Sequence, residues 1–270
     1  MDRDKIIKFY SNEIEKDRLE LDLFKLEGIR TKEIISRYLS GENMRIADIG
    51  GGAGYYSFWL QEKGHHVSLV DLSPKNIELA NQYSQDTGIQ LANSQIGDAT
   101  DLNFKEDQFD LVLLLGPLYH LVNKDDRLQA LSEAKRILKP NGILLIAIIS
   151  RYASLIDGFK RDLITDDNFE KLLINDLQTG IHLNETENPD YFTTAYFHTP
   201  SEIMGEIAES KLKFEKLIAI ESFGWIADDF KAKSEDPSYM SKLRKIINMV
   251  ETNIDIIAMS PHIMAIARKE

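Results

Sequence analysis

The 270-residue sequence contains no cysteine. Without thiols the chain has no disulfide bonds, no thiolate zinc site and no cysteine nucleophile. It also lacks a hydrophobic run approaching the roughly 18 residues that a membrane-spanning helix requires. The residues after Met1 are charged and do not resemble an apolar signal segment. We therefore expect a cytoplasmic location and no membrane partner.

Clusters of basic residues are missing as well. Lys and Arg total 32 against 44 Asp and Glu, which gives a formal net charge of -12. Nucleic-acid binding depends on grouped Lys and Arg side chains that neutralise phosphates, so we expect no nucleic-acid partner. A small or neutral substrate is favoured. The length fits one large domain, or one domain with a substantial insertion, and the 43% hydrophobic content is that of a globular protein.

The segment 46–55 reads Ile-Ala-Asp-Ile-Gly-Gly-Gly-Ala-Gly-Tyr, an apolar stretch that ends in closely spaced glycines. Glycine permits a positive φ and lets a ligand approach the backbone closely. The N–H groups at the start of a following helix attract an anionic or polar group. The turn therefore predicts a cofactor site, whose candidate residues are Asp48, Gly50, Gly51, Gly52 and Gly54.

Expected strands and helices alternate on both sides of this turn. Ser73 and Pro74 form a common helix start, with serine as the N-cap and proline at the first helical position. The nearly continuous apolar run at 109–115 is typical of a parallel strand buried on both faces. The pattern predicts a doubly wound α/β sheet with its ligand at the carboxyl ends of the strands. The strands are expected at 45–49, 67–71, 89–95, 109–115 and 143–149, with helices at 55–63, after Ser73 and at 125–138.

The regular alternation stops after Ser150. We expect an inserted lid with a helix near 167–177, and a new helix from the capping-box segment Thr199-Pro200-Ser201-Glu202. Two further strands, at 214–222 and 263–268, with a helix near 242–251, complete seven mostly parallel strands. The expected organisation is an N-terminal helical cap at 1–40, a core at 41–150, the lid at 151–200 and the rest of the same sheet domain at 201–270.

The glycine spacing resembles motif I of the class I S-adenosylmethionine-dependent methyltransferases. Gly-x-Gly-x-Gly after Asp48 differs from the Gly-x-Gly-x-x-Gly of nicotinamide and flavin sites. Asp71 closes the second expected strand and Asp98 follows the third, where this family holds the ribose hydroxyls and the adenine amino group. The segments 102–104 with 109–110, and 138–142, resemble the family's turns before its fourth and fifth strands. The five marks occur in the family's order.

The resemblance implies a Rossmann-like methyltransferase fold with S-adenosyl-L-methionine as the cofactor. It implies methyl transfer to an O, N or C atom of a small-molecule acceptor by a monomer or homodimer. No metal site is expected, because the adjacent His65 and His66 point to opposite faces of a strand. The implied cofactor-binding residues are Asp48, Gly50, Gly51, Gly52, Gly54, Asp71, Leu72, Asp98, Ala99, Leu115 and, from the N-terminal segment, Tyr10.

The candidate catalytic residues are Tyr119, His120 and His262. The resemblance places the loop with Tyr119 and His120 beside the transferable methyl group, where a histidine of ordinary pKa, about 6.5, can accept a proton. His120 can equally order the loop. His262 precedes the last, antiparallel strand and is expected at the same edge as Glu221 and Trp225, either as a substrate wall or as a surface residue. The aromatic run at 191–198 either lines the site or packs the lid.

Two alternatives from other classes stay open. A nicotinamide-dependent oxidoreductase uses a similar sheet, although the glycine spacing disfavours it. A non-catalytic S-adenosylmethionine-binding or partner module would keep the fold without turnover, since a fold does not supply chemistry by itself. Asp48, Asp71 and Asp98 at the strand ends favour binding of S-adenosylmethionine, whether the protein is a methyltransferase or a non-catalytic module.

Overall fold

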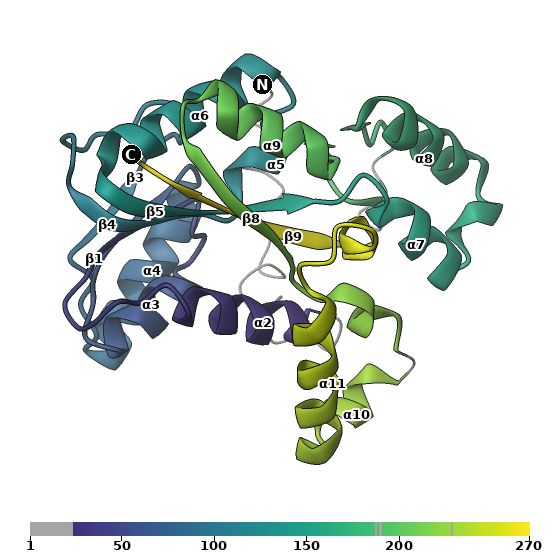
Figure 1. The fold of residues 1–270 in the computed structure, drawn as a ribbon, viewed down its shortest axis with the longest axis horizontal. Coiled ribbons are helices and arrows are strands. Elements are labelled where there is room, and N and C mark those ends of the chain that lie inside the picture. Colours follow the sequence, from purple (N-terminus) through teal and green to yellow (C-terminus); the bar gives the residue numbers. More distant parts are fainter. Residues whose placement is uncertain (1–23, 187, 189–190, 228) are drawn as a thin grey trace.

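The computed structural model describes residues 24–186, 188, 191–227 and 229–270 (Figure 1). Tyr10, proposed as a cofactor contact, lies outside these residues. Within the described part of the chain, no helix is long and apolar enough to cross a membrane.

A seven-stranded sheet with the order β3-β2-β1-β4-β5-β9-β8 forms the centre of the molecule. Within this sheet β9 runs antiparallel to both of its neighbours, and the other pairings are parallel. The predicted doubly wound, mostly parallel sheet is thereby confirmed. Its strands are β1 (Arg45–Ile49), β2 (His66–Asp71), β3 (Asn93–Ile96), β4 (Phe109–Leu114), β5 (Leu138–Ile149), β8 (Lys213–Ala219) and β9 (His262–Arg268).

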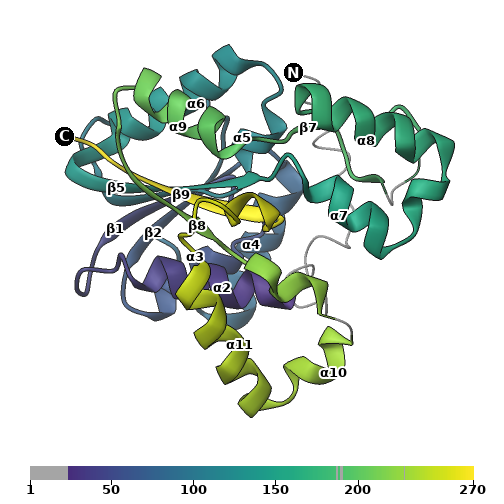
Figure 2. The same cartoon turned by 45° about the vertical axis from the view of Figure 1, so that its right-hand side comes forward.

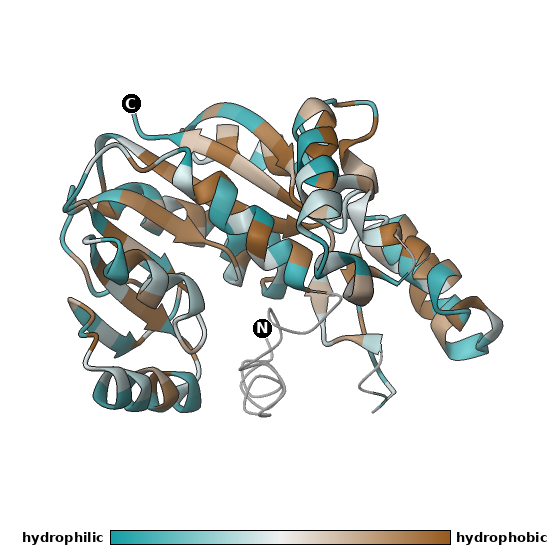
Figure 3. Cartoon of the chain, turned by 90° about the horizontal axis from the view of Figure 1, so that it is seen from below, coloured by the Kyte–Doolittle hydropathy of each residue, from teal (hydrophilic) through white to brown (hydrophobic). Residues whose placement is uncertain are grey.

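Helices cover both faces of the sheet, and this explains why β4 is apolar at nearly every position. Val112 and Leu114 pack on the side of α6 (Lys124–Ile137) and α9 (Pro200–Glu209). Leu111 and Leu113 pack on the opposite side, with α2 (Lys25–Ser36) and α3 (Tyr55–Glu62). This alternation is the two-residue period of a strand. The strands are coloured mostly hydrophobic in Figure 3, and Figure 1 shows helices on both sides of them.

Local signals in the sequence set the helix ends that were predicted. The Ser73 hydroxyl accepts a hydrogen bond from the Asn76 amide at the start of α4 (Pro74–Thr87), and Gly88 ends this helix with a φ of 75°. At the start of α9, Thr199 and Glu202 form the predicted capping box in both directions.

Three strand boundaries differ from the prediction by more than one residue. β3 begins at Asn93, because Ile89 and Leu91 pack onto the Phe58 cluster before the strand starts. β5 already begins at Leu138, which pairs with Phe109 across an irregularity in the register. β8 ends at Ala219 and does not reach Ser222, whose φ of 51° lies in the left-handed region and opens the 3-10 helix η5 (Ser222–Ile226).

Two excursions extend from the sheet (Figures 1 and 2). The first follows β5 and includes a helix that the sequence analysis did not predict, α7 (Ala153–Lys160). The second follows β8 and packs on α2 through a cluster of Leu26, Phe230, Met240 and Ile247. The other elements of the first are η3 (Leu163–Thr165), α8 (Asp167–Thr179), β6 (Ile181–His182) and β7 (Ala195–Tyr196), and those of the second are α10 (Phe230–Ser234) and α11 (Pro237–Val250).

Candidate active site

A cavity of about 460 Å³ lies at the carboxyl ends of the central parallel strands. This is the size and the position expected of a ligand site in a doubly wound sheet. The cavity reaches from the glycine turn after β1 to the start of β9. Every residue predicted to bind the cofactor or to act in catalysis that the structure describes lines it, namely Asp48, Gly50, Gly51, Gly52, Gly54, Asp71, Leu72, Asp98, Ala99, Leu115, Tyr119, His120 and His262.

The glycine turn needs glycine for two different reasons. Gly50, Gly52 and Gly54 have φ angles of 70°, 60° and 93°, which L side chains rarely adopt. A Cβ atom on Gly50 would lie 2.5 Å from the Pro117 ring, so the turn touches the loop that follows β4. A Cβ atom on Gly52 would meet nothing within 4 Å. The backbone at Gly52 therefore faces open space beside the cavity.

Asp48 at the end of β1 is fully buried. Its Oδ2 accepts a hydrogen bond of 2.7 Å from the Ser57 hydroxyl, while its buried Oδ1 has no hydrogen-bond partner among the described residues. Burial raises the pKa of this carboxyl to about 6. A buried oxygen without a partner is costly, so Asp48 fits a site whose ligand brings a donor.

Asp71 at the end of β2 is held by three donors. Its Oδ2 accepts from the Gly52 amide at 2.8 Å, and its Oδ1 accepts from the Ser73 amide at 2.9 Å and the Asn76 side chain at 3.0 Å. Burial raises the pKa of Asp71. Oδ2 has further acceptor capacity, so the fixed group suits a hydroxyl donor.

Asp98 and its neighbours form the wall of the cavity beyond β3. The Asp98 Oδ1 accepts from both the amide and the hydroxyl of Thr100, at 2.9 and 2.8 Å. Leu72 and Ala99 add apolar surface on this wall. Polar groups along the cavity with apolar walls between them fit an adenosine moiety. The residues present therefore fit the implied cofactor.

Tyr119 and His120 belong to the short helix α5 (Pro117–His120), directly after the contact between Gly50 and Pro117. The His120 ring is buried between two aromatic rings, with centroids 4.7 Å from Tyr119 and 6.1 Å from Phe192. Phe192 comes from the predicted aromatic run, whereas its neighbour Tyr191 packs on Phe169 inside the lid. The run thus packs the lid and reaches the His120 ring, but none of its residues lines the cavity.

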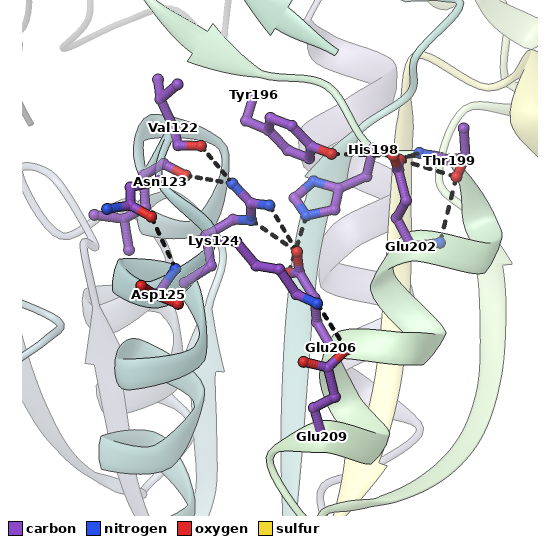
Figure 4. A network of polar contacts seen from close by, with 12 residues as sticks. Val122, Asn123, Lys124, Asp125, Tyr196, His198, Thr199, Glu202, Glu206 and Glu209 are labelled. Atoms are coloured by element: carbon purple, nitrogen blue, oxygen red, sulfur yellow. Dashed lines mark hydrogen bonds and ion pairs between the residues drawn. The ribbon is translucent and has the colours of Figure 1, made fainter. Parts of the chain in front are cut away.

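A buried ionic network supports this loop from behind (Figure 4). The Arg127 guanidinium donates to the carbonyls of Leu121 and Val122, at 2.9 and 2.8 Å. The same guanidinium pairs with Glu206 of α9 at 2.7 Å, and Glu206 in turn contacts the His198 ring at 3.2 Å. Burial is the largest influence on His198 and lowers its pKa. The network joins the loop after α5 to the segment that returns from the lid.

His262 lies where the sequence analysis placed it, at the edge shared with Glu221. Its Nδ1 is 2.6 Å from the Glu221 Oε1. Trp225 donates its indole N–H to the Met259 carbonyl at 3.2 Å. Neither Trp225 nor Glu221 lines the cavity, so only His262 of the expected wall does. Glu27 of α2 also lines the cavity; from the sequence it could equally have closed the site or lain on a solvated helix face. Thr31, four residues later in the same helix, is in the same lining.

Comparison with known proteins supports this interpretation of the site. Residues 47–146 match the family described as "Methyltransferase domain". O-methyltransferase rstn1 of Aspergillus nomiae is 34% identical over 119 residues, 43% of this chain and 52% of that protein. A ubiquinone biosynthesis O-methyltransferase of Rickettsia prowazekii is 29% identical over 134 residues, 48% of this chain and 51% of that protein. The matches thus span about half the length of these relatives.

Solved structures agree in fold across most of the chain. A SAM-dependent methyltransferase of Methanosarcina mazei has a TM-score of 0.59 at 20% identity, covering 87% of this chain and 96% of that one. An S-adenosylmethionine-dependent methyltransferase of Mesorhizobium loti has a TM-score of 0.60 at 16% identity, covering 90% and 99%. At these identities the likeness concerns the fold alone.

The sheet order, the glycine turn and the aspartates at the strand ends are those of the class I S-adenosylmethionine-dependent methyltransferase fold. Residues 47–146 belong to the methyltransferase domain family, and S-adenosyl-L-methionine is the cofactor of this class. The resemblance drawn from the sequence is confirmed.

Proposed function

We propose that the protein transfers a methyl group from S-adenosylmethionine to an O, N or C nucleophile of a small molecule. The observation that carries the proposal is the continuity of one cavity, with the glycine turn and Asp71 at one end and Tyr119, His120 and His262 at the other. Among the three kinds of nucleophile, oxygen is favoured because two of the relatives are named O-methyltransferases.

When bound, S-adenosylmethionine supplies an already activated methyl group. The protein then has to hold the acceptor in line with that group, and such positioning accounts for much of the rate in reactions of this kind. Asp48, Asp71 and Asp98 would hold the cofactor from the strand ends. His120 would accept the proton that the acceptor hydroxyl loses as its oxygen forms the new bond to carbon.

We assign the role of general base to His120 because its loop contacts the glycine turn of the cofactor site. The loop that carries it touches the glycine turn at Gly50, and it is held on the other side by Arg127. His262 lies at the far wall with its Nδ1 engaged by Glu221. We assign His262 to the acceptor wall, opposite His120, and assign Tyr119 to the acceptor side of the loop.

Residues 151–200 would act as the lid of this site. Phe192 reaches from this segment to the His120 ring, and His198 ties its end to the network behind the loop. A lid that contacts the reacting groups can exclude water and select the acceptor. The N-terminal segment 1–40 would add a cap, and we propose a monomer or homodimer as the working unit.

Calorimetric titration tests the cofactor half of the proposal. We expect S-adenosylhomocysteine to bind one site per chain, and NAD⁺ and NADP⁺ not to bind. An Asp71→Asn variant should weaken binding about tenfold or more, since hydrogen bonds to a charged group are worth roughly 1.5–3 kcal/mol. Asp86→Asn, on the exposed side of α4, is the matched control. Binding of a dinucleotide in preference to S-adenosylhomocysteine would refute the proposal.

A further inference from the structure

Three potential metal ligands converge at the acceptor end of the cavity. Glu27, Glu221 and His262 offer one ligand atom each, and these atoms all lie within 4.8 Å of one another. The His262 Nδ1 is 2.6 Å from Glu221 Oε1 and 3.9 Å from Glu27 Oε2. Their side chains are only 12%, 4% and 18% exposed. Three distant parts of the sequence (α2, the turn after β8 and the start of β9) thus meet at one point.

The Glu221 carboxylate is oriented by a shell of its own. Its Oε2 accepts from the Ser260 hydroxyl at 3.0 Å and from the His262 amide at 3.2 Å. The same Ser260 oxygen accepts from the amides of Glu221 and Ser222, at 3.2 and 3.0 Å. These contacts direct Oε1 toward His262 and Glu27. Hydrogen-bonded carboxylate ligands of this kind are typical of metal sites.

The backbone beside Glu221 is strained. Ser222 has a φ of 51°, a conformation that costs free energy in any residue except glycine. Strain of this kind tends to occur where the surrounding structure must hold a functional group in place. The buried Arg30 secures the facing helix, because its Nε donates to the Ile220 carbonyl at 3.1 Å. Glu27, almost one helical turn before Arg30, is thereby held against Glu221.

The second carboxylate distinguishes a metal site from a simple histidine base. A base of the Asp-His type needs one carboxylate on its Nδ1 to orient the ring. Here two carboxylates approach the same nitrogen from different elements. Two carboxylates close together at a largely buried site repel each other, and a cation bound between them offsets this repulsion. A metal ion engages all three groups at once.

We propose that Glu27, Glu221 and His262 bind a divalent cation, Mn²⁺ or Zn²⁺, at the acceptor end of the cavity. Carboxylate oxygen and imidazole nitrogen suit both ions. On binding, the ion would replace the proton shared by His262 and Glu221, and this proton would leave to solvent. Three protein ligands leave further positions for water or an acceptor oxygen. This proposal departs from the expectation, drawn from the sequence, that no metal is bound.

Binding of the ion is independent of methyl transfer, and only its contact with the acceptor rests on the proposed function. The test is therefore a binding measurement on the full chain. The protein is dialysed against EDTA, loaded with S-adenosylhomocysteine, and titrated with Mn²⁺ and separately with Zn²⁺ by calorimetry. We expect one ion per chain, and affinity at least tenfold weaker in each of Glu27→Gln, Glu221→Gln and His262→Asn.

Glu78→Gln is the matched control, because this carboxylate is exposed on α4 and pairs only with Lys75 among the described residues. Its metal affinity should equal that of the unmodified chain. Glu27→Gln keeps the test valid if the buried Glu221 variant fails to fold. Absence of stoichiometric binding of either ion, or binding that the Glu27 and His262 variants leave unchanged, would overturn the site. Failure of S-adenosylhomocysteine itself to bind would instead count against the proposed function.

Discussion

The Asp71 carboxylate accepts a hydrogen bond of 2.8 Å from the Gly52 amide, and this contact joins the end of β2 to the glycine turn after β1. It fixes the acidic group and the turn as one unit at the carboxyl edge of the sheet. Gly52 also faces open space. Its amide therefore binds Asp71, while the missing side chain leaves room for a ligand in the cavity.

Replacing Gly52 by alanine should remove cofactor binding with little further damage. The new methyl group would enter the open space beside the cavity, and the φ of 60° would cost about 1 kcal/mol of stability. Gly88→Ala is the control, because Gly88 has a φ of 75° and equally open surroundings at the far end of α4. Both variants should lose similar stability in urea, and only Gly52→Ala should lose affinity for S-adenosylhomocysteine. Equal affinity in the two variants would contradict this assignment.

Asp48 should make the free protein less stable as the pH rises. Its pKa in the folded state is about 6, above its ordinary value near 4, so the folded state holds the proton more tightly than the unfolded state. Between about pH 4 and pH 6 this proton is lost at a cost of about 3 kcal/mol. The stability of Asp48→Asn relative to the unmodified chain should therefore increase over this window and then level off. A constant difference between the two urea-unfolding curves across pH 4–7 would show that Asp48 is not perturbed.

Arg127→Ala should reduce both stability and turnover. The substitution removes the buried guanidinium from Glu206 and leaves it only His198, which costs up to about 3–5 kcal/mol. It also removes the donors that hold the Leu121 and Val122 carbonyls. Lys124→Ala is the control, because its ion pair with Glu209 is half exposed, and neither stability nor turnover should change. Unfolding in urea and initial rates measure the two effects. If the folded Arg127→Ala variant keeps its turnover, then the Arg127 network does not position the loop that carries His120.

His120→Asn should lower turnover while cofactor affinity stays the same. A positioned general base contributes about 10²–10⁴-fold to a rate, so the loss should fall in this range for a hydroxyl acceptor. The kcat of the variant should also lose the dependence on pH that a titrating histidine gives. If His120→Asn keeps both its rate and its pH profile, then His120 only orders the loop.

The sequence predicts those parts of the fold that depend on neighbouring residues. The helix that starts at Ser73-Pro74, the capping box at Thr199 and the apolar strand β4 are all confirmed. α7 escaped prediction because its residues carry neither a capping side chain nor a start signal, and its N-cap residue Tyr152 makes no side-chain cap. The positions of the cofactor-lining residues were predictable because parallel strands end at one edge.

The contacts at the acceptor end of the cavity were harder to predict from the sequence. The expected strand order already placed Glu221 and His262 at one edge, whereas only the packing of α2 against the turn after β8 brings Glu27 to them. The same holds for Arg127, Glu206 and His198, whose pairing depends on how α9 packs beside α6. No local sequence pattern predicts these contacts, because each depends on how distant helices and strands pack together.

The most direct test of the account is methyl transfer itself. The purified full chain is incubated with S-adenosylmethionine and a library of small metabolites, with and without added Mn²⁺, and the formation of S-adenosylhomocysteine is measured. We expect product with at least one acceptor class that carries a hydroxyl, and none from Gly52→Ala under the same conditions. Binding of the cofactor without turnover on any class of metabolite would contradict the account and favour a non-catalytic module.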